Sequence, residues 1–597
     1  MAKELYERVD RKIGEILIDI KCGKVGLPDL QRPFVWKDFK VRELLDSMMN
    51  GFPIGYVMLW SAPEGYENVS HIGLDEKAYT HPLDLVIDGQ QRLTSLLGAM
   101  FGQEVKGKDF KSRRIRIAFN PLTKKFEVWT PAFEKDTNWI SDISEIFSAE
   151  ADHNLGRYVG GIKKRINEGR LKKDLEPLTE EEGYLIEDNI RDLLSLYDYM
   201  LPTLRIKSIA DEEQVAEIFK RVNSGGQNLN ENNFIETLLA VYDNKVHDKI
   251  MRFCSDSKMP SDNTSYNRII DVESSHLIRM TVGLGFRRGR LSYAYKLLRG
   301  KDLETGILSE ETRLKNLTVF KEALDIVTNL NNWHSFLNLF GEAGYLKGSL
   351  VSSRYTVVFG YIIYLIGKTQ YKVVPEELRR IITLWLFMTS VTSYYTNSTS
   401  AESTIEKIFA DFRNIKTSDE FISYLLTQIK LNLTEDFFNV TLPADLNSSA
   451  AISPSWYAYL ASLNVLGTNL LFSNIPASAF WIAGYHGSIS SIDKHHLYPK
   501  NYLIKNGIVS NREINQIANF TYIDKTTNII ISDNPPAEYV DKIKSKIGED
   551  AYYRSLAENA IPENFGQDNY FEFLRKRRML MAGIVRKAYL KLKGEPV

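Results

Sequence analysis

Hydrophobic positions in the first hundred residues recur with helical spacing in three places. One stripe, at intervals of three and four residues, consists of Ile13, Ile16, Leu17 and Ile20. A second stripe of this kind consists of Val41, Leu44, Leu45 and Met48, and a third of Leu93, Leu96, Leu97 and Met100. Because such spacing places the members of a stripe on one side of a helix, each segment is predicted to be an amphipathic helix with one buried face.

Short apolar runs between these stripes predict strands. The runs IGYVMLW (54–60), LDLVI (83–87) and LPTLRIK (201–207) have the length and composition of buried strands. The runs RIRIAFN (114–120) and KFEVWT (125–130) predict a hairpin. In LPDLQRPFVW, Pro28 and Pro33 exclude a helix and favour extended chain. With a further helix over 211–222, capped by Asp211, residues 1–240 are predicted to form one α+β domain.

The remaining chain changes character twice. Residues 241–445 show mainly helical periodicity and few strand patterns, which predicts a helical linker domain. Strand and turn patterns return after residue 446, and three of the nine histidines fall between 486 and 496. The sequence therefore predicts a multidomain α+β protein with domains at 1–240, 241–445 and 446–597.

Composition excludes several classes of protein. Of the 597 residues, 44% are hydrophobic and 25% are charged, which is ordinary for globular domains. The 75 Lys and Arg residues nearly cancel the 76 Asp and Glu residues, which argues against a histone-like polybasic protein. The only cysteines, Cys22 and Cys254, exclude a disulfide framework and a Cys-rich zinc module. Because no apolar stretch is long enough to cross a bilayer, we expect a cytoplasmic protein with no membrane partner.

The strongest chemical pattern lies near the C-terminus, in SIDKHHLYPKNYL and the segment after it. His495 and His496 are adjacent and are followed by Pro499, and Asn528 stands nine residues beyond Asn519. A neutral imidazole near pH 7 can take a proton from water, and a hard divalent cation needs only two or three protein ligands because it keeps waters. The alternative is a helix–loop region in which these side chains only cap and pack. The set resembles the HNH (His-Me finger) nuclease motif, a ββα-metal unit.

That resemblance implies a role for each residue. His496 matches the general base of the family, and Asn519 matches the asparagine that braces the histidine loop. Asn528 matches the distal ligand of a catalytic Mg²⁺ or Mn²⁺ ion. His495 stands where a carboxylate or histidine ligand is usual, so it counts among the catalytic candidates, and Asp493 lies two residues earlier. Which of His495 and Asp493 touches the metal stays open.

A second pattern lies in the first domain, in VIDGQQRLTSLL. A strand delivers Asp88, Gly89 permits a sharp turn, and the next helix presents free N–H groups and the positive end of its dipole. Asp88 could hold a metal and Arg92 could bind phosphate as a fork. The alternative is an ordinary strand-to-helix turn in which Arg92 pairs with Asp88. FKRVNSGGQNL supplies a third motif, which could equally be a plain helix C-cap.

In this order, QRP, DGQQR and NSGG resemble the N-terminal domain of GmrSD-like type IV restriction enzymes. The resemblance implies a ParB/sulfiredoxin-like fold around a nucleotide pocket, with Asp88 among the catalytic residues. The nucleotide-binding residues that it implies are Gln31, Arg32, Asp88, Gln90, Gln91, Arg92, Asn223, Gly225 and Gly226.

The combined resemblance implies an NTP-dependent or NTP-regulated endonuclease or nickase that acts on modified foreign DNA in defence against phage. The expected partners are double-stranded DNA, base-modified or phosphorothioate, and an NTP, either GTP or another; a homodimer and other defence proteins stay open. A basic stretch that could face DNA, or could be only a solvated helix surface, consists of Arg575, Lys576, Arg577 and Arg578. The rival functions are an NTPase whose C-terminal domain only binds DNA, and a non-enzymatic ParB-like DNA clamp.

Overall fold

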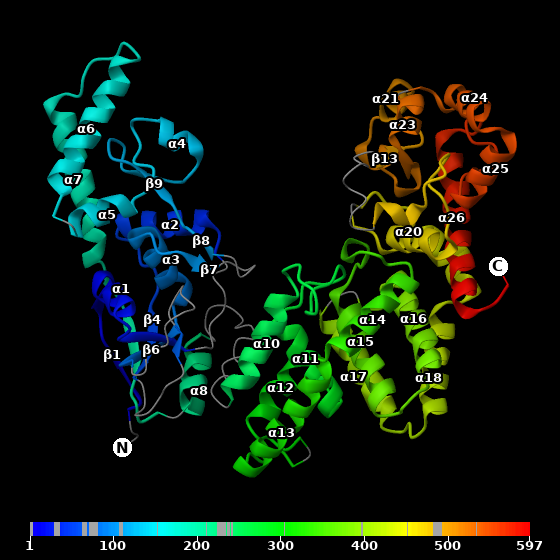
Figure 1. Ribbon diagram of the computed structural model, residues 1–597, viewed down its shortest axis with the longest axis horizontal. Coiled ribbons are helices and arrows are strands. Elements are labelled where there is room, and N and C mark those ends of the chain that lie inside the picture. The colour runs from blue at the N-terminus through cyan, green and yellow to red at the C-terminus, as the bar shows by residue number, and fades with distance from the viewer. Residues whose placement is uncertain are drawn as a thin grey trace. The chain divides into compact units, whose positions relative to one another are not determined.

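The computed structural model describes residues 4–28, 36–61, 69–70, 82–106, 112–151, 153–210, 212–223, 235, 239, 243–303, 305–395, 398–450, 452–481, 492–532 and 534–596. The chain forms two compact units, Met1–Met251 and Arg252–Val597, which are described separately (Figure 1). The predicted residues that lie outside the described ones are Gln31, Arg32, Asp211, Gly225 and Gly226. The side chains of Asn223 and Asp493 also lie outside the described part, although their backbones belong to regular elements.

A mixed sheet of six strands organises the first unit. Its spatial order is β1 (Tyr6–Arg8), β12 (Thr203–Ile206), β4 (Val57–Ser61), β6 (Asp84–Asp88), β3 (Val25–Pro28) and β5 (Val69–Ser70). The β12–β4 and β3–β6 pairs are parallel, and the other neighbours are antiparallel. Three of the apolar runs form β4, β6 and β12, which confirms the strand predictions.

Helices cover both faces of this sheet. The three predicted stripes form α1 (Ile13–Lys21), α2 (Asp38–Met49) and α3 (Gln90–Phe101), and every stripe residue is buried. Side chains alternate along β4, so Val57 and Leu59 join the core with these helices, whereas Met58 and Trp60 join a second core. Helix α8 (Glu212–Asn223) packs against that second core. The sheet is therefore sandwiched between helices.

Further elements of the first unit flank the sandwich. The predicted hairpin is confirmed as β9 (Ile117–Asn120) paired with β10 (Lys125–Val128). The helices that follow are α4 (Pro131–Lys135), α5 (Ser144–Ala151), α6 (Leu155–Leu171) and α7 (Glu180–Leu194), and a 3-10 turn covers Ser195–Asp198. Two short pairs join β2 (Arg11–Lys12) to β11 (Met200–Leu201), and β7 (Val105–Lys106) to β8 (Ser112–Arg113).

Helices form most of the second unit, which confirms the helical prediction for its first part. They are α10 (Asn244–Asp256), which begins in the first unit, α11 (Ser274–Phe286), α12 (Leu291–Leu298), α13 (Glu310–Val327), α14 (Leu330–Glu342), α15 (Arg354–Thr369), α16 (Pro375–Val391), α17 (Ser398–Phe412), α18 (Ser418–Asn432) and α19 (Leu442–Asp445). A 3-10 turn covers Gly348–Leu350, and a short π-helix covers Phe437–Thr441.

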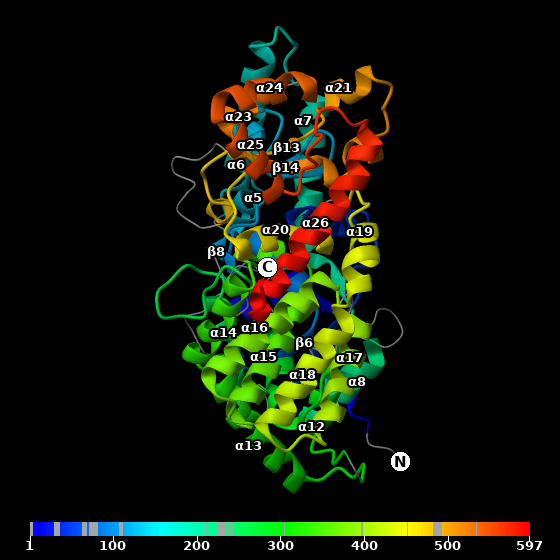
Figure 2. The same cartoon turned by 90° about the vertical axis from the view of Figure 1, so that its right-hand side faces the viewer.

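The C-terminal part adds one hairpin and more helices. In chain order these are α20 (Pro454–Leu466), η4 (Ala477–Phe480), β13 (Ile492–His496), α21 (Lys500–Lys505), α22 (Asn511–Ile514), η6 (Ile517–Asn519), β14 (Phe520–Asp524), α23 (Lys525–Ile531), α24 (Pro536–Ile547), α25 (Glu549–Glu558) and α26 (Tyr570–Lys593). Helix α26 packs along α20, and both contact α16 (Figure 2). The helical and C-terminal parts thus share one compact unit, and the division into three domains stays a prediction.

The whole chain is therefore mixed α+β, with a sheet in the first unit and a largely helical second unit. Within the described residues, no helix is both long and apolar enough to span a membrane. Cys22 is exposed and Cys254 is buried, and neither forms a disulfide within the described part of the chain.

Candidate functional site

The two histidines end the first strand of a strand–loop–strand–helix arrangement. Strand β13 pairs antiparallel with β14, so that His495 lies opposite Thr521 and His496 opposite Phe520. Strand β14 leads directly into α23, which contacts both strands and carries Asn528. Asp524 fixes this junction, because its carboxylate accepts hydrogen bonds from the Thr527 amide at 3.0 Å and the Thr527 hydroxyl at 2.9 Å. Four predicted residues, His495, His496, Asn519 and Asn528, thus belong to one compact motif.

His496 has the environment of a proton acceptor. Its half-buried ring packs on Phe520 with a centroid separation of 4.4 Å, and its Nε2 lies 3.0 Å from Oδ1 of Asn515. Because an amide oxygen can only accept, Nε2 carries the proton and Nδ1 carries the lone pair. Burial lowers the pKa of His496, the bond to Asn515 raises it, and the charges of Lys494 and Lys500 lower it, so the net pKa lies below its ordinary value of 6.5. The imidazole is therefore neutral at pH 7.

Asn519 ties the loop after the histidines to the start of β14. Its side chain is fully buried, and its Oδ1 accepts a hydrogen bond from the Tyr498 amide at 2.8 Å. Its Nδ2 donates to the carbonyl oxygens of Tyr498, at 3.1 Å, and Ile514, at 3.2 Å. The Leu497 amide also donates to the Asn519 carbonyl at 2.8 Å. A side chain with donor and acceptor at one end is required for this set of bonds, which fixes the chain just beyond His496.

Arg577 of α26 holds the chain on both sides of Asn519. Its guanidinium is completely buried, and Nη1 donates to the Ala518 carbonyl at 2.6 Å and the Phe520 carbonyl at 2.8 Å. Burial lowers the pKa of the Arg577 guanidinium. Arginines are rarely buried, because removing their charge from water costs free energy. The long terminal helix therefore fixes the hairpin through one buried cation.

The predicted metal ligands fit a hard divalent ion by donor type. His495 on β13 and Asn528 on α23 are both half-buried and lie on elements that contact each other. One imidazole nitrogen and one amide oxygen suit an ion that keeps several waters. Among the described side chains, no group of three or more His, Cys, Asp and Glu residues could hold a metal. The choice between His495 and Asp493 as a ligand stays a prediction.

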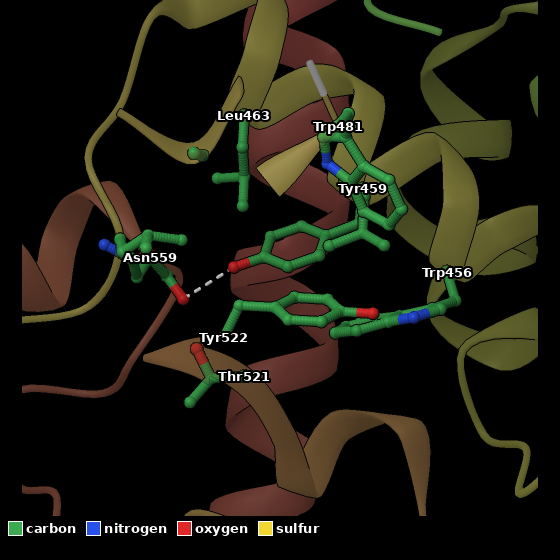
Figure 3. Close-up of a pocket in the computed structure, with 10 residues that line it drawn as sticks. Trp456, Tyr459, Leu463, Trp481, Thr521, Tyr522 and Asn559 are labelled. Carbon is green, nitrogen blue, oxygen red and sulfur yellow. Dashed lines mark hydrogen bonds between the residues drawn. The ribbon is translucent and has the colours of Figure 1, made fainter. Parts of the chain in front are cut away.

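A small cavity lined largely by aromatic and aliphatic side chains lies beside β14. Figure 3 shows Trp456 and Tyr522 lying nearly parallel, with Trp481 edge-on to Tyr522. The Tyr459 hydroxyl closes one end by donating to the Asn559 carbonyl at 2.8 Å. The open volume is only about 10 Å³, the space of about one water molecule. The cavity is part of the packing that positions Tyr522, the neighbour of Thr521, rather than a ligand pocket.

In the first unit, DGQQR forms a strand-to-helix turn at the end of β6. Gly89 has φ +94°, and a Cβ there would lie 2.7 Å from Cγ2 of Val57, so only glycine fits. Helix α3 begins at Gln90 without a side-chain cap, which leaves its first N–H groups facing out of the helix. The β4–β6 register shifts between Met58 and Leu59, next to Asp88. Asp88, Gln90, Gln91 and Arg92 are thus brought together at one turn.

Arg92 is already engaged by the protein. Its Nη1 donates to the Ile54 carbonyl at 2.8 Å, and its Nη2 lies 3.9 Å from Oδ2 of Asp88. Gly55 permits this approach, because a Cβ there would lie 2.6 Å from Nη1. The structural alternative for Arg92, pairing with Asp88, is therefore the arrangement observed, and the guanidinium positions the 54–55 turn against α3.

A groove of about 570 Å³ opens on the other face of the sheet. Its apolar walls come from β12 and α8, and its rim carries Tyr56, Arg8 and Arg221. Burial raises the pKa of Tyr56, and the nearby charge of Asp88 raises it further while that of Arg92 lowers it, so Tyr56 lies close to the turn as well as in the groove. An apolar floor with cations at its edge suits a ligand that has both a flat ring and phosphates.

The basic stretch of α26 is mostly tied to the protein itself. Arg577 is buried, so it cannot contact DNA, and this part of the prediction needs correction. Lys576 bonds Asp568 at 2.8 Å, and Arg578 donates to the Asn447 side chain at 3.0 Å. Arg575 is exposed and pairs with Glu572. A run of four cations on one helix was bound to place at least one inward, because successive residues turn by about 100°.

The roles of two residues at the candidate site could not be predicted from the sequence patterns described above. Asn515 orients the His496 ring, but an asparagine in a loop gives no specific pattern. The sequence pattern shows Arg577 as part of a charged run. Helical spacing also places it on the same side as the apolar Phe573, Leu574 and Met581, and this spacing favours its burial.

Residues 13–240 match the model of a family described as "GmrSD restriction endonuclease, N-terminal domain". An uncharacterized protein of Methanocaldococcus jannaschii is 24% identical to this chain over 604 aligned residues, which cover 93% of this chain and 91% of that protein. Similarity to that protein therefore extends through both units.

Replacing Arg577 should destabilise the second unit. In Arg577→Met the carbonyls of Ala518 and Phe520 lose their donor, at a cost of about 1–3 kcal/mol for each. Arg577→Lys restores one donor and should lie between Met and wild type. Thermal unfolding of the full chain measures the effect, and Arg575→Met, on the exposed side of the same helix, should change stability by less than about 0.5 kcal/mol. Equal unfolding temperatures for the Arg577 and Arg575 variants would show that the buried cation does not hold the hairpin.

Proposed function

We propose that this chain, whose residues 13–240 belong to the GmrSD restriction endonuclease N-terminal domain family, is a modification-dependent DNA endonuclease that cuts with its C-terminal hairpin. The observation that carries the proposal is the β13–β14–α23 motif, in which His496 ends a strand that contacts the helix carrying Asn528, the proposed amide ligand. Foreign DNA with modified bases or phosphorothioate linkages, as met in defence against phage, is the substrate class.

His496 is the general base of the proposed reaction. Its Nδ1 takes a proton from a water molecule, whose oxygen forms a bond to the scissile phosphorus while the bond from phosphorus to the leaving sugar oxygen breaks. The leaving oxygen then takes a proton from solvent. A bound Mg²⁺ or Mn²⁺ ion, held by Asn528 and by His495 or Asp493, would neutralise the phosphate and stabilise the leaving oxygen.

The surrounding residues keep His496 ready for this step. Asn515 holds Nε2 as a donor, so the lone pair of Nδ1 is available. Lys494 and Lys500 disfavour protonation of the ring and also attract a polyanion. Asn519 and Arg577 fix the backbone on either side of the motif, which limits the entropy lost when the reacting groups align.

The proposed role of the first unit is to bind an NTP, GTP or another, and to couple that binding to recognition of DNA. The uncapped start of α3 favours phosphate, and the groove beside Tyr56 suits a base and ribose. Gln31, Arg32, Asn223, Gly225 and Gly226 complete the proposed nucleotide site by family resemblance. Two alternatives remain, an NTPase whose second unit only binds DNA and a DNA clamp without turnover, and neither accounts for the buried framework around His496.

Replacing His496 tests the nuclease directly. Purified wild-type protein should cut DNA in Mg²⁺ or Mn²⁺, and His496→Ala should cut it at least about 100-fold more slowly, because a general base contributes that much or more. The variant should keep the unfolding temperature and the DNA affinity of the wild type. His153→Asn, at an exposed position of the first unit, is the matched control and should cut normally. Equal cleavage by His496→Ala and wild type would remove His496 from the mechanism.

The dependence of cleavage on pH gives a second test. Because only neutral His496 can accept a proton, the rate should drop with falling pH through the lowered pKa, at a pH below that at which an ordinary histidine is protonated. Lys494→Gln removes a charge that lowers this pKa, so the drop should move to higher pH. Lys505→Gln, on the nearby helix α21, should leave the profile unchanged. A shift to lower pH in Lys494→Gln, or no shift, would contradict the assignment.

A further inference from the structure

Helix α6 carries a dense set of cations that the site described above does not use. Between residues 155 and 174 the sequence has seven Lys and Arg residues against only Glu168 and Asp174. The buried side of the helix consists of Val159, Ile162, Ile166 and Gly169. It packs on α5 and α7, and Figure 1 shows the α6–α7 pair extending away from the sheet of its unit. The opposite side of α6 faces solvent.

Helix α7 neutralises only the inner cations of α6. Lys163 pairs with Glu187 at 2.5 Å, and Arg170 pairs with Glu182 at 2.6 Å. The remaining five are exposed, and none has a carboxylate within 4.0 Å in the described part of the chain: Arg157, Lys164, Arg165, Lys172 and Lys173. Arg165 makes one bond, to the Trp139 carbonyl at 2.8 Å. Helix α7 has acidic residues, but they reach only the cations of α6 that face it. Among the described residues, the outer cations lack carboxylate partners because they point away from α7.

Three of these cations, Arg157, Lys164 and Lys172, fall along one side of the helix axis, with Lys172 just past the helix end at Leu171. Arg157 and Lys164 are seven residues apart, which is nearly two turns and about 10 Å, and Lys172 lies about 22 Å from Arg157 along the axis. A duplex segment of that length carries about 13 phosphate charges. Glu168 is the one acid on this side. The face therefore complements a rigid, linear polyanion over its whole length.

The same side of α6 has an open backbone. A Cβ added at Gly156, Gly160 or Gly161 would meet nothing within 4 Å, so packing within the unit does not require these glycines. Each costs about 1 kcal/mol relative to alanine in an exposed helix. Their effect is to leave the space between Arg157 and Lys164 clear of side chains, so that a phosphate backbone can lie close to the helix.

We propose that the exposed face of α6 is a docking surface for the sugar–phosphate backbone of double-stranded DNA. It supplies affinity independent of base sequence and of modification, and thereby holds the duplex while the rest of the unit senses it. The proposal rests on the proposed function only in taking DNA as the partner.

Binding in the absence of cleavage tests the surface. Full-length protein is titrated, in EDTA, into a fluorescent unmodified duplex of about 24 base pairs, and anisotropy gives Kd at several salt concentrations. Arg157→Gln/Lys164→Gln/Lys172→Gln should bind at least about tenfold more weakly at low salt. Because each lost phosphate contact lowers the slope of log K against log salt by about 0.9, the slope should fall by about two to three.

A triple variant of equal charge change is the control. Lys125→Gln/Lys135→Gln/Arg191→Gln removes three exposed cations elsewhere in the unit and should bind as wild type does. Equal weakening in both variants would show that net charge alone acts, and unchanged binding in the α6 variant would overturn the proposal. A wild-type chain that does not bind the duplex would also overturn the proposal. Binding to anionic phospholipid vesicles is measured in parallel, and an α6 variant that loses vesicle binding but keeps duplex binding would overturn it too. If the wild type binds the duplex through α6 but shows no metal-dependent cleavage, the proposed nuclease activity is contradicted and the docking surface is still supported.

Discussion

The candidate nuclease motif depends on one buried amide. Asn519 uses both ends of its side chain to bind Tyr498 and Ile514, and so closes the long loop between β13 and β14. An unsatisfied polar group in that position would cost about 1–3 kcal/mol, so the loop has one strongly favoured geometry. Arg577 reinforces it through the peptide carbonyls on either side. The orientation of His496 and the entry into α23 follow from this frame.

The two candidate sites share one structural feature: an arginine from another segment donates hydrogen bonds to backbone carbonyls and so fixes the local chain. At the C-terminal motif a buried arginine from a distant helix holds the chain around Asn519. At the DGQQR turn, Arg92 holds the Ile54 carbonyl, while Gly89 and Gly55 permit close approach. In both places an arginine that lies in a motif suggested for phosphate binding also donates a hydrogen bond to a backbone carbonyl.

Much of this arrangement could be predicted from periodicity. The stripes of α1, α2 and α3, the runs of β4, β6 and β12, and the β9–β10 hairpin follow from spacing alone, because burial of one face determines which positions are apolar. The motif residues His495, His496, Asn519 and Asn528 could be found because their types and spacing are unusual. Asn515 and the buried state of Arg577 could not, since each depends on contacts between segments distant in sequence. The unpaired face of α6 likewise emerges only once α7 is placed beside α6.

The proposed function joins a metal-dependent nuclease and a nucleotide-regulated sensor of modified DNA in one chain. A cleavage panel tests this most directly, with unmodified, base-modified and phosphorothioate duplexes, each with and without GTP or ATP, in Mg²⁺. We expect one class of modified duplex to be cut and the unmodified one to be spared. NTP should change the rate in the wild type but not in Asp88→Asn, and His496→Ala should cut none of them. Cleavage that is indifferent to modification and to NTP would contradict the sensor, and the absence of cleavage on every substrate would contradict the nuclease.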